Sequence, residues 1–307
     1  MFLTGRISGS PLLSLDVTST ALPKSLFGYD VIELIGEGAA SLIYAVSKQD
    51  TKQLYALKHV VRKSDKHARF IEQLENEYNV GKRLSHPNLR RVIEMQNKRT
   101  LLGKVTEAVL VMELFDGQPL ENRLPKELPK LLDIMIHTAQ AIEHMHNMGF
   151  VHCDLKPINI LVNTQGVVKV IDLGQAAPVG TTKKRIQGTP DYISPEQVKL
   201  APVTVRTDIF NFGATMYWAL SGQKLPTLFT IQKAKNAFLV DQFVSKPHEL
   251  NPQVPENLSN FVMECVRTNP AKRPDDMGQV ISRLEIMQHV LTREAASSPS
   301  PTGRGPG

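Results

Sequence analysis

The sequence predicts an α+β fold with two unequal lobes, a small strand-rich lobe followed by a larger helical lobe. From Tyr29 to about Leu114, short segments rich in β-branched and aromatic residues alternate with Gly, Asp and Lys turns, which is typical of strands. From Pro129 onward, apolar residues recur at helical spacing instead. Where the two patterns meet, near Phe115–Gly117, we expect a cleft.

Five strands and one helix are expected in the small lobe, residues 28–114. The strands are expected at Tyr29–Ile35, Leu42–Ser47, Gln53–Val60, Arg91–Gln96 and Thr106–Glu113. The helix is expected from about Lys66 to Leu84, and a Ser-His-Pro sequence ends it. Gly81 lies inside this helix, and because glycine costs about 1 kcal/mol relative to alanine there, we expect it to loosen the helix.

Three apolar stripes predict helices in the large lobe, residues 118–292. The first stripe comprises Leu132, Met135, Ala139, Ile142 and Met145, and Gly149 closes it. The second comprises Leu258, Phe261, Val262, Cys265 and Val266. The third comprises Met277, Val280, Ile281 and Leu284, with Asp275 expected as the N-cap.

Both ends of the chain differ in composition from the middle. Residues 1–27 are rich in Ser, Thr, Leu and Gly, and residues 293–307 are mostly Ala, Ser, Pro and Gly. We expect a flexible N-terminal tail, with docking of its last part on the body left open, and a disordered C-terminal tail around one folded domain at 28–292.

The composition is that of an ordinary globular protein. The 307 residues carry a net charge of +6, a mild excess that a solvated basic surface explains, so no nucleic acid partner is expected. No stretch approaches the ~20 apolar residues that cross a bilayer, and we expect no membrane anchor. The only cysteines, Cys153 and Cys265, cannot form a disulfide framework. A reducing compartment, the cytoplasm, is therefore expected. The oligomeric state stays open.

The segment from Val151 to Asn159 carries the strongest chemical signal. Asp154, Lys156 and Asn159 lie within six residues, between a helix and an apolar run. This set offers a general base, a cation for phosphate and a metal ligand. Asp172 follows a short predicted strand and precedes a Leu-Gly turn, which suits a divalent cation.

Two upstream features fit a phosphate-binding function. The sequence Ile-Gly-Glu-Gly-Ala-Ala-Ser at 35–41 lies between two predicted strands, and its glycines let backbone amides approach phosphates. Lys58 lies in the third strand. A glycine turn and a strand lysine are each weak signals when taken alone.

Taken in order, GEGAAS, YALK, HCDLKPIN, DLG and SPE resemble the eukaryotic-type serine/threonine protein kinase family, from roughly Gly28 to Val290. The Ser-Pro-Glu-Gln form of the last motif leans toward bacterial members. The resemblance implies a bilobal kinase fold, with a small antiparallel β-sheet lobe plus one helix and a larger mainly α-helical lobe. It also implies ATP and Mg²⁺ (or Mn²⁺) as cofactors and proteins as substrates.

The resemblance assigns roles residue by residue. Asp154 orients and deprotonates the substrate hydroxyl, Lys156 steadies the γ-phosphate, and Thr189 bonds both. Asn159 and Asp172 hold the metal ion. Lys58 binds the α- and β-phosphates and pairs with Glu77, although nearby Glu72 and Glu75 leave Glu77 open to being a solvated helix charge.

The same resemblance predicts the nucleotide pocket. The glycine loop contributes Gly36, Glu37, Gly38 and Ser41, the last in place of the third glycine. Met112 matches the gatekeeper, and the backbones of Glu113 and Phe115 face adenine. Ile43, Ala56 and Leu161 sandwich its ring, and ordinary core packing is an equally compatible role for these three.

Several residues have structural roles in the family, and others depart from its pattern. Glu196 is expected to pair with Arg273, and Asp208 to hold the catalytic loop backbone. Cys153 replaces the arginine that reads an activation-loop phosphate, so activity is expected to depend less on loop phosphorylation. A reactive thiol and a buried small hydrophobe are both open for Cys153; we favour the second. Leu173 replaces the usual Phe.

Two further clusters are interpreted as structural. The histidines at 137, 144 and 146 have poor spacing for one metal site and are expected to be satisfied or exposed. The Lys-Lys-Arg run at 183–185 is expected to be a solvated loop.

Three functions remain possible: an active kinase for protein Ser/Thr, a pseudokinase that signals by binding nucleotide, and a small-molecule kinase. The complete catalytic set argues against the second. The segment Gly188–Glu196 argues against the third, because related small-molecule kinases lack it.

Overall fold

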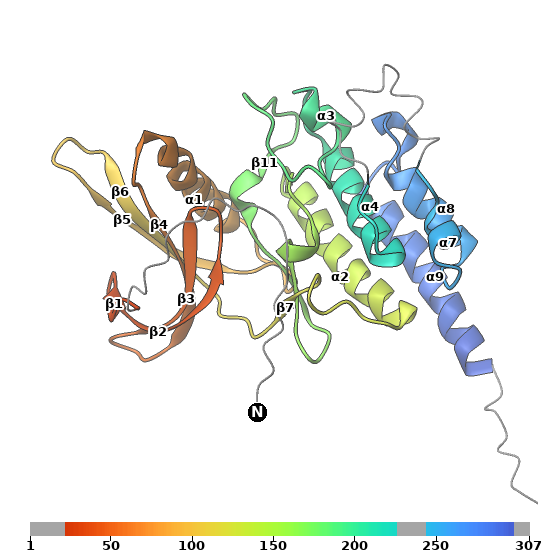
Figure 1. The fold of residues 1–307 in the computed structure, drawn as a ribbon, viewed down its shortest axis with the longest axis horizontal. Coiled ribbons are helices and arrows are strands. Elements are labelled where there is room, and N and C mark those ends of the chain that lie inside the picture. The colour runs from red at the N-terminus through yellow and green to blue at the C-terminus, as the bar shows by residue number, and fades with distance from the viewer. Residues whose placement is uncertain (1–21, 226–243, 298–307) are drawn as a thin grey trace, which may run out of the picture.

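The computed structural model describes residues 22–225 and 244–297 of the chain, and the view in Figure 1 separates two lobes. Most of the expected tails, 1–27 and 293–307, lie outside these residues. The expected α+β architecture is confirmed: a curled antiparallel sheet with one helix forms the small lobe, and helices dominate the large lobe.

The small lobe is a six-stranded antiparallel sheet in the order β1-β2-β3-β4-β6-β5. Its strands are β1 (Ser25–Leu26), β2 (Tyr29–Glu37), β3 (Ser41–Lys48), β4 (Leu54–Val61), β5 (Val92–Arg99) and β6 (Val105–Met112). Five of them match the expected strands to within three residues at each end. The extra strand, β1, lies inside the segment expected to be a tail.

One helix, α1 (Ala68–Gly81), packs against the sheet and follows a short 3₁₀ turn, η1 (Asp65–His67). Its inward face buries Ile71, Leu74, Glu77 and Val80 at helical spacing. The helix ends three residues earlier than expected. Beyond Gly81 the hydrogen bonds span three residues instead of four, because Arg83 N–H donates to Val80 O and Leu84 N–H to Gly81 O.

Gly81 has a packing role that the sequence did not show. A Cβ added at Gly81 would lie 2.8 Å from Cγ1 of Val92, at the start of β5. The missing side chain therefore lets the end of α1 approach the sheet closely. The expectation that Gly81 loosens the helix is not tested. The close approach to Val92 explains instead why a residue without a side chain occupies this position.

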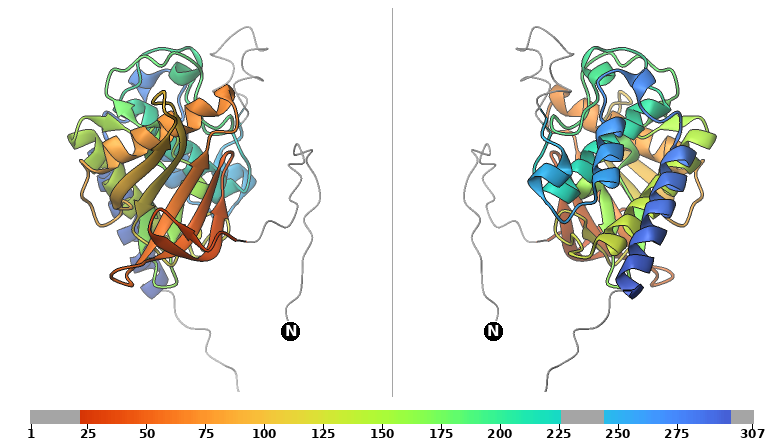
Figure 2. Two further views of the ribbon diagram at one scale, coloured as in Figure 1. Left: turned by 90° about the vertical axis from the view of Figure 1, so that its left-hand side faces the viewer. Right: turned by 90° about the vertical axis from the view of Figure 1, so that its right-hand side faces the viewer.

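The large lobe is built around α2 (Leu128–Asn147), α4 (Val205–Ser221), α8 (Glu256–Cys265) and α9 (Met277–Ser297). Figure 2 (right) shows α9 lying along α2, and the two helices are in contact. Shorter helices α3 (Pro195–Val198) and α7 (Pro247–Leu250) flank α4. All three predicted apolar stripes lie in the main core.

The N-cap of α9 is shifted by one residue from the expected position. Asp276 Oδ1, not Asp275, accepts a hydrogen bond from the Gln279 N–H, at 2.9 Å. Asp275 instead bonds the side chains of Arg206 and Gln279. Both aspartates fit a capping pattern, so the sequence alone did not separate them.

Short strands carry the catalytic segments to the junction of the lobes. A three-stranded sheet joins β7 (Gln118–Pro119), β9 (Ile160–Val162) and β10 (Val168–Val170), and β8 (Phe150–Val151) pairs with β11 (Ala177–Pro178). The segment before β5 forms a parallel bridge with one edge of β10, because Val170 N–H donates to Asn88 O at 2.7 Å and Arg90 N–H to Val170 O at 3.0 Å.

We predict that Gly81→Ala lowers the free energy of unfolding by about 1–2 kcal/mol, because overpacking against Val92 outweighs the gain of about 1 kcal/mol in helix propensity. Denaturant unfolding of the variant measures the change. In a Val92→Ala background the clash is gone, so Gly81→Ala should there be neutral or stabilising. A destabilisation of equal size in both backgrounds would contradict the packing role.

Candidate active site

The loop between β8 and β9 is held by one buried carboxylate. Asp208, on α4, accepts the N–H of His152 at 2.7 Å and the N–H of Cys153 at 2.8 Å, and its Oδ2 also bonds Nε2 of His146. Burial opposes the charge, but the bonds from His146 and the Cys153 N–H lower the pKa of Asp208. The expected structural role of Asp208 is confirmed.

Asp154, Lys156 and Thr189 form a closed triangle of hydrogen bonds. Lys156 Nζ donates to Asp154 Oδ2 at 2.8 Å and to Thr189 Oγ1 at 2.6 Å. The hydroxyl of Thr189 donates to Asp154 Oδ1 at 3.0 Å. Thr189 is 35 residues from Asp154 in the chain. The triangle therefore joins Gly188–Glu196, the end of the predicted activation segment, to the loop between β8 and β9, the predicted catalytic loop.

A second cluster joins the lobes. Lys58 Nζ, on β4, donates to Glu77 Oε2 at 2.7 Å and to Asp172 Oδ1 at 3.1 Å. Burial opposes the charge on Lys58, but the two carboxylates raise its pKa. The Lys58 ammonium lowers the pKa of Asp172 against its burial, whereas burial raises the pKa of Glu77 despite the same partner. Glu77 is thus paired, whereas Glu72 and Glu75 have no such partner in the described part of the chain.

Asn76 was not expected to matter, yet it ties α1 to the turn after Asp172. Its Nδ2 lies 3.3, 3.2 and 2.9 Å from the carbonyl oxygens of Leu173, Gly174 and Ala176. Asparagine in mid-helix is unfavourable by propensity, because its short amide side chain competes for backbone hydrogen bonds. That was the one signal in the sequence that pointed to Asn76.

The oxygen donors at Asn159 and Asp172 fit a hard divalent cation. Asn159 Nδ2 donates to Asp154 O at 2.8 Å, which leaves its amide oxygen free to coordinate. The Ile171 N–H donates to Asn159 O at 3.0 Å and so brings Asp172 beside the same loop. One carboxylate and one amide suit Mg²⁺, which keeps waters and takes phosphate oxygens for the rest of its shell. The described residues contain no larger cluster of His, Cys, Asp and Glu that could hold a metal ion.

The predicted adenine residues gather at the end of the small-lobe sheet and at the segment that leaves it. Ala56 lies opposite Met112, and Ile43 opposite Gly36, in neighbouring strand pairs. Leu161 lies on β9 in the large lobe, 8% exposed. Ala56 is fully buried and Ile43 is half-buried, but none of the three belongs to a hydrophobic core cluster of the described residues. Their contact with adenine stays a prediction.

The backbone of the connecting segment is only partly free. The Phe115 N–H has no partner among the residues that the structure describes, so it is available to a ligand. Phe115 O accepts from the Gly117 N–H at 3.0 Å, and Glu113 O accepts from Arg90 Nε at 3.1 Å. Since a carbonyl oxygen has two lone pairs, Glu113 retains one for a further donor.

A cavity of about 140 Å³ lies between the glycine loop, α1 and the Asp172 turn, with Lys58 and Asp172 in its wall. The loop itself closes as a tight turn, because the Gly38 N–H donates to Ser41 O at 2.8 Å. Glu37 lies at the end of β2, which leads into this turn. The wall of this cavity therefore combines backbone amides, one ammonium and one carboxylate.

The C-terminal end of the activation segment, at Glu196 and Gln197, is anchored to the large lobe. Arg273 forms a two-pronged ion pair with Glu196, at 2.7 and 3.0 Å, which confirms the expected pairing. Gln197, not expected to take part, donates from Nε2 to Cys153 O at 2.7 Å and to Gln187 O at 3.2 Å. It therefore links the segment to the catalytic loop directly.

Cys153 occupies the position at which the family has an arginine, and Lys183 lies within electrostatic range of it. Burial raises the pKa of the Cys153 thiol, which is 1% exposed, so the thiol is a small buried hydrophobe rather than a reactive group. Lys183 was expected in a solvated loop, but it is half-buried, and its Nζ donates to Gln175 O at 2.7 Å. Burial lowers the pKa of Lys183, and the carboxylate of Asp208 opposes this. The solvated interpretation holds only for residues 184–185, which are exposed.

The three histidines of α2 have separate partners. His144 stacks on His86, with ring centroids 5.3 Å apart, His146 bonds Asp208, and His137 lies 3.6 Å from Asp133. The three side chains therefore have different neighbours and do not converge on one point.

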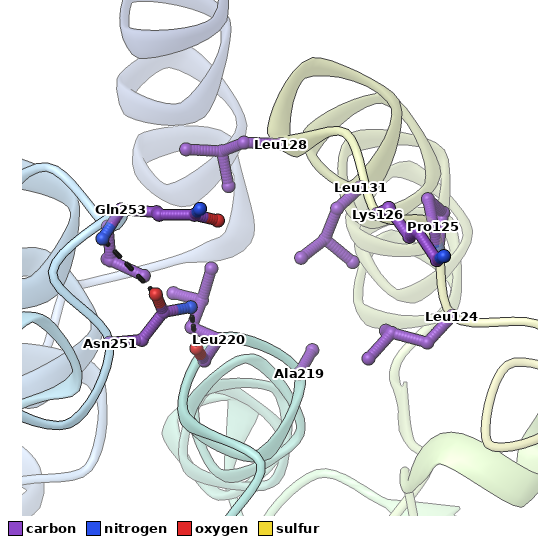
Figure 3. A pocket seen from close by; sticks show the side chains of 10 residues that line it. Leu124, Pro125, Lys126, Leu128, Leu131, Ala219, Leu220, Asn251 and Gln253 are labelled. Carbon is purple, nitrogen blue, oxygen red and sulfur yellow. Dashed lines mark hydrogen bonds between the residues drawn. The ribbon is translucent and has the colours of Figure 1, made fainter.

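A second hollow, of about 390 Å³, lies in the large lobe between the start of α2, the end of α4 and the loop before α8 (Figure 3). Its wall is mostly apolar, with four leucines among ten residues, and Asn251 there donates to Leu220 O at 2.9 Å. Lys126 is the one charged residue among those that line it.

The two lobes, with the Lys58 cluster and the Asp154 triangle where they meet, define the protein kinase class of fold. Residues 29–290 match the protein kinase domain family, and the chain belongs to that family.

Curated relatives are named as kinases in bacteria and plants. The chain is 26% identical over 274 residues to a probable serine/threonine-protein kinase of Clostridium acetobutylicum, covering 85% of this chain and 40% of the relative. It is 28% identical over 285 residues to serine/threonine-protein kinase PknA of Mycobacterium tuberculosis, covering 90% and 65%. Mitogen-activated protein kinase kinase kinase 3 of Arabidopsis thaliana is 29% identical over 291 residues, covering 89% and 42%. The chain thus spans about two fifths of the length of the clostridial relative.

The resemblance inferred from the motifs, including its bacterial lean, is confirmed by these matches. No helix in the described ranges has the length and apolar character needed to cross a membrane.

We predict that Arg273→Leu lowers the free energy of unfolding by about 3–5 kcal/mol, because it leaves the Glu196 carboxylate buried without its cation. The Arg273 side chain is fully buried in this pair. Denaturant unfolding measures the loss. Arg283→Leu is the matched control: it removes a half-exposed pair with Glu264 and should cost about 1 kcal/mol or less. Equal losses in the two variants would contradict this account.

Proposed function

We propose that the chain is an ATP-dependent serine/threonine protein kinase, which transfers the γ-phosphate of ATP to Ser or Thr hydroxyls of protein substrates. The triangle of Asp154, Lys156 and Thr189 is the observation that supports this most directly. It sets a carboxylate and an ammonium side by side at the mouth of the cleft, as phosphoryl transfer requires.

In the proposed reaction Asp154 orients the substrate hydroxyl and accepts its proton. Lys156, 2.8 Å from that carboxylate, neutralises charge on the γ-phosphoryl group as it moves. Thr189 fixes the two side chains relative to each other. The protein forms no covalent bond to the phosphoryl group in this mechanism, since positioning and charge neutralisation supply most of the catalysis.

In the same proposal, Lys58 binds the α- and β-phosphates while Glu77 holds its ammonium in place. Asn159 and Asp172 hold Mg²⁺ or Mn²⁺, which supplies charge neutralisation on the phosphates when bound. The glycine loop covers the phosphates with backbone amides. The adenine pocket is formed by Ile43, Ala56, Met112, Glu113, Phe115 and Leu161.

The ordered activation segment supports a protein substrate. Gln197 and the Glu196–Arg273 pair hold its end against the large lobe, which gives an extended peptide a fixed surface beside Asp154. A small-molecule kinase has no need of this platform. A pseudokinase is also less favoured, because Lys58, Asp154, Asn159 and Asp172 are all present and correctly grouped.

We further propose a kinase domain at 28–292 that acts in the cytoplasm, with tails at each end. The strand β1 and the last turn of α9 extend the folded part slightly beyond these bounds. Both cysteines are free and buried, as suits a reducing compartment. Proteins are the proposed partners, and we propose none among nucleic acids.

Phosphate transfer from γ-labelled ATP tests this function. The purified chain is incubated with Mg²⁺ or Mn²⁺ and a generic basic acceptor protein, with Asp172→Ala as the control. We expect label on Ser or Thr that the control lacks. ATP binding without label under either metal would favour the pseudokinase, and label on small alcohols but not on protein would favour a small-molecule kinase.

We predict that Asp154→Asn lowers turnover about 10²–10⁴-fold while ATP affinity is largely kept, because the change removes the proton acceptor but no nucleotide contact. Steady-state kinetics and nucleotide titration separate the two effects. Asp133→Asn, at a half-exposed acid on α2, is the matched control and should match the parent. Normal turnover of Asp154→Asn would remove this residue from its role.

We propose that activity does not strictly depend on activation-loop phosphorylation. The neutral thiol of Cys153 cannot bind a phosphate group. The ammonium of Lys183 donates a hydrogen bond to the backbone carbonyl of Gln175. A lysine of the loop itself thus supplies the charge that ties the loop to the Asp172 turn. No added phosphate is needed for that contact.

We therefore predict that phosphatase treatment leaves most of the activity intact, and that Lys183→Met lowers it about tenfold, since hydrogen bonds from charged groups contribute about 1.5–3 kcal/mol. Kinetics before and after treatment measure the first effect. Lys184→Met, at the exposed neighbour, should change little. Complete loss on dephosphorylation, or full activity of Lys183→Met, would contradict this mechanism.

A further inference from the structure

The turn that joins β5 to β6 presents two leucines to solvent. Leu101 and Leu102 are 107% and 96% exposed, so neither side chain contacts the body of the protein. The β5–β6 hairpin forms the left edge of the molecule in Figure 1, at the end of the small lobe that lies farthest from the large lobe. Two fully exposed leucines at a protruding tip need an explanation, whereas single exposed leucines do not.

This turn is well ordered by its own backbone. Thr100 N–H donates to Lys104 O and Gly103 N–H to Thr100 O, both at 2.9 Å, and Lys104 N–H bonds Thr100 Oγ1 at 3.2 Å. Gly103, with φ of 79°, takes the left-handed position that such a loop requires. The two leucines occupy the central turn positions, where polar residues are usual. The backbone therefore holds them outward.

The segments next to this turn carry an excess of cations. Six cations and two carboxylates lie in the segments 62–66 and 98–104 and at residue 107. The cations are Arg62, Lys63, Lys66, Lys98, Arg99 and Lys104, and the carboxylates are Asp65 and Glu107. The segments are adjacent, because Arg62 N–H donates to Thr106 O at 2.8 Å and Lys104 Nζ bonds Asp65 at 2.6 Å. Arg99 bonds only neutral groups, Asn97 Oδ1 and Gly103 O, within the described residues.

We propose that this hairpin-tip surface, residues 62–66 and 98–104, docks the protein reversibly on an anionic lipid bilayer. Leu101 and Leu102 would enter the boundary between headgroups and acyl chains, and the cations of these segments would face the lipid phosphates. Apolar insertion and charge attraction are each weak on this small scale, so binding requires both.

The chemistry of the tip favours lipid over other polyanions. Residues 98–104 include no aromatic side chain on which a base could stack, and leucines add nothing to a contact with nucleic acid phosphates. The tip is also a protrusion rather than a groove. Because the large lobe lies at the opposite end of the molecule, docking through the tip would leave the cleft between the lobes open to a substrate.

Vesicle flotation tests the proposal with the full chain. We expect binding to phosphatidylcholine vesicles that contain phosphatidylserine, no binding to phosphatidylcholine alone, and loss of binding at about 1 M salt, where the Debye length is about 3 Å. The double variant Leu101→Ser/Leu102→Ser should lower the partition to anionic vesicles at least about tenfold, because both apolar side chains are removed. Its unfolding midpoint should match that of the parent, since neither leucine packs against the body.

Ile286→Ser/Val290→Ser is the matched control, because these residues are also exposed but lie on α9, at 65% and 43% exposure. It should bind vesicles like the parent. Equal flotation of the leucine variant and the parent would overturn the proposal, as would absence of flotation. Leucine-dependent binding to duplex DNA in the same buffer would overturn it in favour of a nucleic acid surface.

Discussion

The ammonium of Lys58, held between two carboxylates, is the interaction on which the site depends. It joins β4, α1 and the turn after β10, three segments that no backbone ladder connects. One cation between two anions leaves an excess negative charge, which the burial of Glu77 makes costly. A divalent cation at Asp172 would relieve that cost, so the cluster that closes the lobes also favours the metal ion that the proposed reaction needs. Asn76 strengthens the same junction with neutral hydrogen bonds that no change of charge disturbs.

Asp208 has the corresponding role in the large lobe. Its carboxylate holds the backbone of a loop that bends at Cys153, whose φ of 66° lies in the left-handed region. Such a conformation is strained for a residue with a side chain, and it persists because two buried hydrogen bonds to Asp208 over-determine it. The loop is therefore rigid before any ligand binds. Since the thiol contributes no charge, the positive charge in this region comes from Lys183 instead.

Local patterns predicted most of the elements and the catalytic motifs, because each depends on residues that are close together in the sequence. Hydrophobic periodicity and turn residues were sufficient to predict the strands of the small lobe and the three apolar stripes. Asn76 and Gln197 were missed for the opposite reason. Asn76 reaches carbonyl groups 97–100 residues away, and Gln197 a carbonyl group 44 residues away, and no local pattern encodes such bonds. Gly81 was read through helix propensity, whereas its close contact with Val92 is a tertiary constraint.

The hairpin tip and the active site are connected by the start of α1. Asp65 bonds both Lys104 of the tip and Arg62 at the end of β4, and η1, which contains Asp65, runs directly into α1. Twelve residues further on, the same helical segment places Glu77 against Lys58. A bilayer that drew Lys104 away from Asp65 would leave the N-terminal end of this segment held by Arg62 through one exposed ion pair, while Asn76 and Glu77 would still hold its centre. Because the anchors lie near the middle and the exposed ion pairs at the start, a force at the tip would reach the fraying end of the segment before it reached the Lys58 cluster.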